Sequence, residues 1–99
     1  MKLLEAHEIK EKLKGLQGWE LNEKKDMLHK NFQFQNFTSA VCFLNRAAEL
    51  AELEDHHPDL HLTNYRNLKV VLSTHSAGGL TKKDFLLAAQ IEEAHRGEA

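Results

Sequence analysis

The stretch Leu68-Lys69-Val70-Val71-Leu72-Ser73-Thr74-His75 carries the clearest strand pattern in this chain of 99 residues. Leu68, Val70 and Leu72 recur at every second position, so the three apolar side chains share one face of the strand. His75 ends the predicted strand, and the following Ser76-Ala77-Gly78-Gly79 is typical of a flexible loop. We therefore expect a sheet with one apolar face covered by helices.

Alternation and helical spacing predict six further elements on the two sides of this strand. They are helices over about 6–14, 38–53 and 81–95, and strands over 19–21, 27–35 and 60–64. The predicted order is α-β-β-α-β-β-α, and residues 1–99 are expected to form one domain. The fold class is α+β, with one four-stranded sheet and three helices packed on one face.

Local signals mark the ends of the helices. Asn36 or Thr38 can cap the second helix, which must end before Pro58. Thr81 and Asp84 are spaced as a capping box for the third helix. The second helix is expected to bury the apolar stripe Phe37, Ala40, Val41, Leu44, Ala48 and Ala51. The aromatic residues expected in the core or in an interface are Trp19, Phe32, Phe34, Phe37 and Phe43.

Composition and charge exclude several classes of protein. A net charge of −2 does not provide the basic patch that nucleic-acid binding requires, although Phe32 and Phe34 alternate as on an RNA-stacking sheet. The single cysteine, Cys42, excludes an intrachain disulfide and is expected to pack in the core. The sequence contains no apolar run of about 18 residues, so it does not predict a membrane span. We expect a cytoplasmic protein.

Histidines are the most informative residues of the sequence. Four of the seven, namely His56, His57, His61 and His75, fall within about twenty residues. If the last two strands pair as a hairpin, the Asp55-His56-His57 segment and His75 lie at the same end of the sheet. Histidine suits proton transfer near neutral pH. Glu52 and Asp55 could orient an imidazole, whereas Asp84 is first of all a helix-capping carboxylate with a possible second role in the site.

Three other roles for these residues compete with acid–base catalysis. A histidine pair at a helix C-terminus can simply complement the helix dipole. A metal site is disfavoured because HExxH is absent and Pro58 interrupts the helical spacing of His57 and His61. Ser73 and Ser76 lack the context of a nucleophile elbow. We expect no metal and no cofactor.

The spacing Glu52-x3-His56-His57-Pro58, followed by Tyr65, His75 and Asp84, resembles the signature of the pterin-4a-carbinolamine dehydratase family. Further similarity lies in Gly18-Trp19, in Phe32-x-Phe34-x-x-Phe37 and in Leu72-Ser73-Thr74-His75. The resemblance covers nearly the whole chain from Gly18 onward. One departure is the segment 59–64, which lacks an aromatic pair present in some members and carries His61 instead.

The resemblance implies an antiparallel sheet, a homodimer or homotetramer, and a metal-free hydro-lyase. The implied reaction is the dehydration of 4a-hydroxytetrahydrobiopterin to quinonoid dihydropterin, which supports tetrahydrobiopterin recycling. The implied catalytic residues are His56, His57 and His75. The implied substrate-contacting residues are Asp55, His56, His57, Ser73, Thr74, His75 and Ser76, with Glu52 and Asp84 in support.

Several points stay open at the level of sequence. The roles of acid and base can be divided either way between His56 and His75, while His57 is expected to hold the substrate or to tune its neighbour. The physiological pterin and its pathway, which could be molybdopterin metabolism, are not specified, and no transcription-factor partner is carried over. The competing function is a non-catalytic pterin-binding or protein-interaction module with the same fold.

Overall fold

The structure, a computed structural model, describes residues 2–97 of the chain. The elements follow one another as α1 (Ala6–Leu13), β1 (Glu20–Leu21), β2 (Leu28–Gln33), α2 (Phe37–Glu54), β3 (Asp59–Thr63), β4 (Asn67–Leu72), the short 3-10 helix η1 (His75–Ala77) and α3 (Lys82–Gly97). This order confirms the predicted α-β-β-α-β-β-α arrangement and the α+β class.

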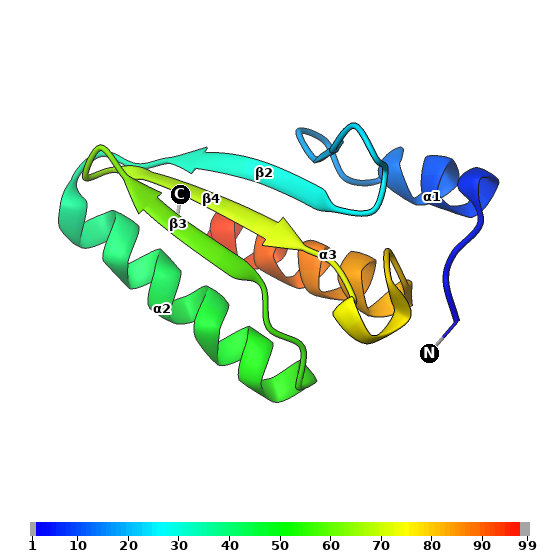
Figure 1. Ribbon diagram of the computed structural model, residues 1–99. Coiled ribbons are helices and arrows are strands. Elements are labelled where there is room, and N and C mark those ends of the chain that lie inside the picture. The colour runs from blue at the N-terminus through cyan, green and yellow to red at the C-terminus, as the bar shows by residue number, and fades with distance from the viewer. Residues whose placement is uncertain (1, 98–99) are drawn as a thin grey trace.

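The four strands form one sheet in the order β1-β2-β4-β3, and every neighbouring pair is antiparallel. β4 is central, since Val70 pairs with Lys30 of β2 on one side and with Leu60 of β3 on the other. In Figure 1, α2 and α3 lie across the same face of the sheet, and α1 lies near the end where β1 and β2 meet. The predicted hairpins between β1 and β2 and between β3 and β4 are both confirmed.

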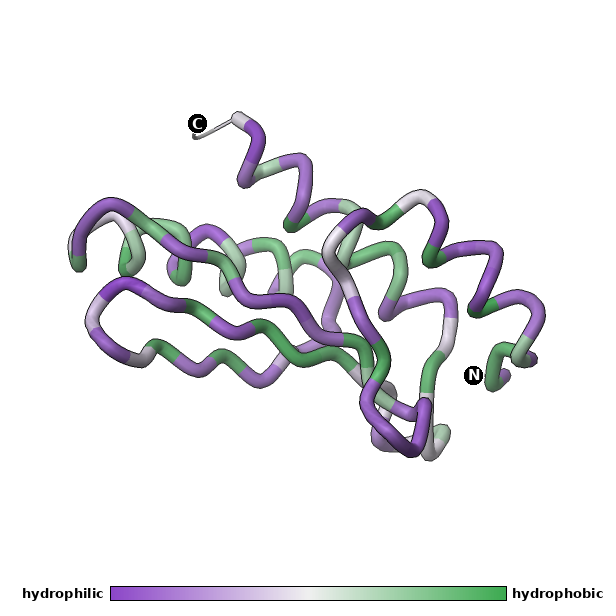
Figure 2. The backbone as a smooth tube through the Cα atoms, turned by 90° about the horizontal axis from the view of Figure 1, so that it is seen from above, coloured by the Kyte–Doolittle hydropathy of each residue, from purple (hydrophilic) through white to green (hydrophobic). Residues whose placement is uncertain are grey.

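The core lies between this face of the sheet and the helices. Leu68, Val70 and Leu72 of β4 are fully buried, as their alternation predicts. Complete burial of an apolar side chain of this size contributes about 1.5–3 kcal/mol. Figure 2 shows hydrophobic residues alternating with hydrophilic ones along the chain. The other large buried side chains are Ile9, Leu16, Trp19, Leu28, Phe32, Phe43, Leu80, Phe85, Leu87 and Ile91.

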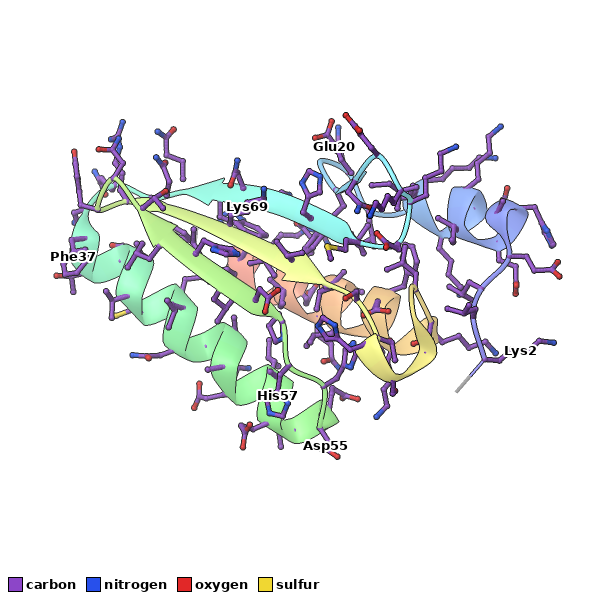
Figure 3. All side chains as sticks on the ribbon, viewed as in Figure 1. Lys2, Glu20, Phe37, Asp55, His57 and Lys69 are labelled. Carbon is purple, nitrogen blue, oxygen red and sulfur yellow. The ribbon has the colours of Figure 1, made fainter. Side chains whose placement is uncertain are left out.

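The buried face of α2 differs in part from the predicted stripe. Its buried residues are Ala40, Phe43, Ala47 and Ala51, whereas Val41, Leu44 and Ala48 are only partly buried. Small alanines let the helix approach the sheet, and the Phe43 ring inserts between Phe32 and Phe34. Phe37 is 54% exposed, so its predicted burial in this stripe is wrong, because it opens the helix where the chain leaves the sheet. Its alternative place in an interface stays a prediction. Figure 3 shows Phe37 at this end of α2.

Two further expectations about this helix have different outcomes. Asn36 caps α2, since its side chain accepts a hydrogen bond of 2.8 Å from the Ser39 backbone N–H. Cys42 is exposed, so the prediction that it packs in the core is wrong. Cys42 lies between the buried Ala40 and Phe43 in the sequence, but it is outside the helix face that contacts the sheet.

β4 is shorter than predicted, because it ends at Leu72 instead of His75. The chain turns at Thr74, which forms an isolated bridge with Gly79, with a hydrogen bond of 2.8 Å from the Thr74 N–H to the Gly79 carbonyl. His75 therefore opens η1, and the segment expected as a flexible loop is a hydrogen-bonded turn. Gly78 closes the turn at φ 80°, a conformation that glycine adopts without steric cost.

Among the residues that the structure describes, no helix combines the length and the apolar character needed to cross a membrane.

Candidate active site

The end of α2 turns His56 into the protein. Asp55 adopts the left-handed conformation at φ 51° and ψ 44°, and the His56 N–H bonds to the Ala51 carbonyl at 3.0 Å. Such a turn is a common way to end a helix. As a result His56 is buried while its neighbours Asp55 and His57 are exposed, as Figure 3 shows for the two labelled residues.

His56 meets Asp84 at the start of α3. The distance from His56 Nε2 to Asp84 Oδ1 is 2.6 Å, and the Asp84 side chain is fully buried. The other oxygen of Asp84, Oδ2, accepts hydrogen bonds from the Thr81 N–H at 2.9 Å and from the Thr74 hydroxyl at 2.8 Å. Asp84 thus caps α3, as its spacing from Thr81 predicts, and at the same time holds the imidazole of His56.

The second predicted site segment, Ser73-Thr74-His75-Ser76, reaches the contact between His56 and Asp84 through Thr74. This residue is buried beside Asp84, and His75 follows it directly in the chain. The pairing of β3 with β4 sets Asp59, just after the histidine pair, opposite Val71. The structure therefore brings the Asp55-His56-His57 segment and the Thr74-His75 segment together at one end of the sheet, as the antiparallel pairing predicts.

The remaining predicted residues surround this buried pair. His57 Nε2 lies 2.6 Å from Glu52 Oε2, and both side chains are largely exposed. His75 and Ser76 are exposed on η1, and Ser73 is half-buried. A substrate could therefore contact exposed polar groups beside a buried histidine that is oriented by a carboxylate. The hydroxyl of Thr74 donates to Asp84 and lies 2.8 Å from the Thr81 hydroxyl, and its contact with a substrate stays a prediction.

Tyr65, which belongs to the quoted sequence pattern, lies away from the histidines. It occupies the turn between β3 and β4 at φ 53° and is 56% exposed, with the Arg66 guanidinium 5.9 Å from the centre of its ring. The five residues of β3, at about 3.3 Å per residue, lie between this turn and the histidine end of the sheet. The sequence spacing alone did not show this separation.

Sequence reasoning missed two other features. A hollow of about 580 Å³ lies between the end of β2 and the start of α2, and is lined by Gln33, Phe34, Gln35, Thr38, Ser39, Cys42 and His95. It contains none of the predicted site residues. His95 packs against the rings of Phe32 and Phe43, with centroid distances of 4.8 and 5.4 Å. Nothing in the local sequence indicated this packing, because it depends on how α3 crosses the sheet.

Within residues 2–97, no three or more His, Cys, Asp or Glu side chains are grouped so that they could hold a metal ion. The chemistry that the described residues offer is proton transfer by imidazoles and carboxylates. Fold and site together define an α+β protein with a buried histidine–aspartate pair at the end of its central strand.

Comparisons with known proteins agree with this description. The sequence profile of the family described as pterin 4 alpha carbinolamine dehydratase matches residues 2–94. The chain belongs to this family, which confirms the resemblance drawn from its sequence.

Individual relatives cover most of the chain. The mitochondrial pterin-4-alpha-carbinolamine dehydratase 2 of Arabidopsis thaliana is 45% identical over 83 residues, which are 82% of this chain and 44% of that protein. A Roseiflexus castenholzii protein that is provisionally named pterin-4-alpha-carbinolamine dehydratase is 47% identical over 91 residues, covering 92% of this chain and 95% of its own length.

Solved structures show the same fold. The crystal structure of a transcriptional coactivator/pterin dehydratase from Brucella melitensis superposes with a TM-score of 0.87 at 33% identity, over 92% of this chain and 96% of that one. A pterin dehydratase-like protein described as a RuBisCO assembly factor in the alpha-carboxysome gives a TM-score of 0.65 at 23% identity, over 77% of this chain and 87% of its own. The second likeness concerns the fold alone.

Proposed function

We propose that this chain is a 4a-hydroxytetrahydrobiopterin dehydratase, which converts pterin-4a-carbinolamine to quinonoid dihydropterin and water and so supports tetrahydrobiopterin recycling. The observation that carries the proposal is the buried contact of 2.6 Å between His56 and Asp84, with exposed histidines in the segments beside it. The family profile over residues 2–94 supports the choice of substrate.

The reaction requires two proton transfers. The hydroxyl group on C4a leaves as water after it receives a proton, and a ring N–H of the pterin loses one. A protonated imidazole can donate the first proton and a neutral imidazole can accept the second, so the protein needs no net proton. His56 and His75 fill these roles in an order that remains open, and His57 holds the substrate. Asp84 stabilises a positive charge on His56, in the way that a buried aspartate assists histidine in the serine-protease triad.

Exposed polar groups surround the two catalytic histidines and complete the proposed substrate site. Asp55 and His57 precede β3, and Ser73, His75 and Ser76 follow β4. In this proposal Glu52 orients His57, with which it is paired at 2.6 Å. The acid–base mechanism includes no metal and no cofactor.

The test is turnover of chemically generated carbinolamine by the purified protein. We expect dehydration well above the uncatalysed rate, and we expect His56→Ala to lower it by about 10²-fold or more, the usual size of an acid–base contribution. His61→Ala is the matched control, because His61 is an exposed histidine of β3. Binding of a pterin without turnover would instead support the non-catalytic binding module.

We also propose that the protein acts as a homodimer or homotetramer. Large apolar side chains remain exposed on its helices, with Leu53 of α2 at 77% and Leu86 of α3 at 48%. Exposed apolar surface favours association. Sedimentation analysis at micromolar concentration should give a mass of two or four chains; an 11.3 kDa species alone would contradict the proposal.

The protein's place of action is proposed to be the cytoplasm, where a protein with a single free cysteine needs no disulfide.

A further inference from the structure

We infer that Thr74 and Thr81 are positioning residues that act through Asp84 to fix the tautomer and the orientation of His56. The structural part of this inference stands on hydrogen-bond geometry, and its effect on turnover rests on the function proposed above. Neither hydroxyl is expected to touch the substrate, since both residues are buried.

The direction of the hydrogen bonds follows from counting protons. A threonine hydroxyl carries one hydrogen, and the Thr74 hydroxyl donates it to Asp84 Oδ2 at 2.8 Å. The Thr74 and Thr81 hydroxyl oxygens are also 2.8 Å apart. Because Thr74 has no second hydrogen to give, Thr81 must be the donor in this contact. The chain of donors therefore runs from Thr81 to Thr74 to Asp84.

The same count fixes the proton on His56. Asp84 Oδ2 already accepts from the Thr74 hydroxyl and from the Thr81 N–H, which leaves Oδ1 to face His56 Nε2 at 2.6 Å. An ionised carboxylate only accepts hydrogen bonds, so Nε2 must carry the hydrogen. Neutral His56 is then the Nε2–H tautomer with its lone pair on Nδ1. Nδ1 is consequently the atom that takes a proton from the pterin or returns one to it.

Thr74 also connects the two catalytic histidines. Its backbone N–H bonds to the Gly79 carbonyl at 2.8 Å, which holds the turn that carries His75. Its side chain holds Asp84, which holds His56. A single residue therefore fixes the backbone next to one histidine and the side-chain partner of the other.

The direct test is the tautomer of His56, measured by long-range ¹H–¹⁵N NMR on the full chain labelled in its histidines. At a pH where His56 is neutral, we expect a proton on Nε2 and a bare Nδ1. Thr74→Val keeps the shape but removes the hydroxyl that holds Asp84 Oδ2. The carboxylate can then turn away from His56 Nε2, so His56 should shift toward a mixture of tautomers. A wild-type His56 with its proton on Nδ1, or a tautomer unchanged in Thr74→Val, would overturn the inference.

Kinetics give a second readout. Thr74→Val should lower kcat by about 10-fold to 100-fold, the range expected when a hydrogen bond to a charged group is lost, with KM nearly unchanged. Thr81→Val should have the smaller effect, since its backbone N–H still reaches Asp84. Thr74→Ser restores the hydroxyl and should recover most of the loss. If Thr74→Ser were as impaired as Thr74→Val, the hydroxyl would not be the active group and the inference would fail.

Failure of this inference can be distinguished from failure of the proposed function. If the wild-type protein does not dehydrate the carbinolamine but His56 shows the Nε2–H tautomer and responds to Thr74→Val, the positioning role stands and the function is wrong. If turnover is normal but the tautomer does not depend on Thr74, the function stands and the positioning role is wrong. The wild-type spectrum needs no variant, so poor folding of Thr74→Val leaves the inference testable.

Discussion

Asp84 and Glu92 are two carboxylates of the same helix, α3, and both are buried, yet their partners differ. Asp84 accepts one hydrogen bond from the Thr74 hydroxyl and one from the Thr81 backbone N–H, and it faces the imidazole of His56. Glu92 accepts a hydrogen bond of 2.9 Å from Trp19 Nε1 and pairs with Lys30, whose ammonium group also bonds to the Gln17 carbonyl.

The difference separates a structural ion pair from a site that can react. Lysine stays charged near neutral pH, so the Lys30–Glu92 pair holds the segment before β1 and strand β2 against α3. Histidine changes its charge near neutral pH, so a carboxylate that binds it can stabilise one protonation state during a reaction. We expect substitutions around Glu92 to change stability and substitutions around Asp84 to change chemistry.

The largest expected effect is on kcat at the histidine end. His56→Ala and His75→Ala should each lower kcat by about 10²-fold or more, while the melting temperature changes little. The double variant should lose less than the product of the two effects, because both residues serve one proton-transfer sequence. Steady-state kinetics and thermal melts measure the two properties separately. Near-normal turnover in both single variants, with lowered melting temperatures, would favour a purely structural role.

The next effect is on stability at the other carboxylate. Glu92→Gln leaves the charge of Lys30 without a partner in a site where its side chain is only 19% exposed. We expect the free energy of unfolding to fall by about 2–3 kcal/mol, somewhat less than for a fully buried pair. Glu93→Gln is the control, because Glu93 is exposed and forms its ion pair with the equally exposed Arg96. Urea titration measures the stability of both variants. Equal stability would contradict a structural role for the Lys30–Glu92 pair.

A smaller effect is expected at the exposed pair of Glu52 and His57. Because both side chains are largely exposed, the pair itself adds little to stability. His57→Ala should raise KM several-fold, if its role is to hold the pterin, with a smaller change in kcat than at His56. His61→Ala should leave both constants near their wild-type values. A fall in kcat as large as that of His56→Ala would place His57 among the acid–base groups.

The smallest effect concerns Glu8, a partly buried carboxylate in the first turn of α1. Glu8 accepts a hydrogen bond of 3.0 Å from the Glu5 N–H, and this bond lowers the pKa of Glu8. A lowered pKa in the folded state stabilises the fold above the unfolded pKa, and this contribution is lost as the pH falls through the folded value. NMR titration should show Glu8 ionising at lower pH in the protein than in a peptide of residues 2–14. Identical titration curves would contradict the capping interaction.

The sequence predicts most of the fold because the decisive signals are local. The alternation of Leu68, Val70 and Leu72 predicts β4 and its buried face, and the spacing of Thr81 and Asp84 predicts the start of α3. The end of β4 was wrong by three residues, since the bridge from Thr74 to Gly79 is not visible in an alternating pattern.

The site was predictable only in part. The histidine cluster and the antiparallel ends indicate where it lies, but the bond from His56 to Asp84 joins residues 28 positions apart. Its formation depends on how α3 packs beside the end of α2, which no local pattern records. The pair of Lys30 and Glu92 is separated by 62 positions and was not predicted for the same reason.

In the proposed mechanism Asp84 acts on chemistry through His56, and one matched comparison tests this role most directly. Asp84→Asn and Glu92→Gln each remove one buried charge from α3 and keep the shape of the side chain. Measured per folded molecule, kcat for carbinolamine dehydration should fall by about 10²-fold or more in Asp84→Asn, because an amide cannot stabilise the imidazolium of His56 in the same way. In Glu92→Gln it should stay within about twofold of wild type, since Glu92 contacts neither histidine segment. Equal kcat values in the two variants would contradict the account.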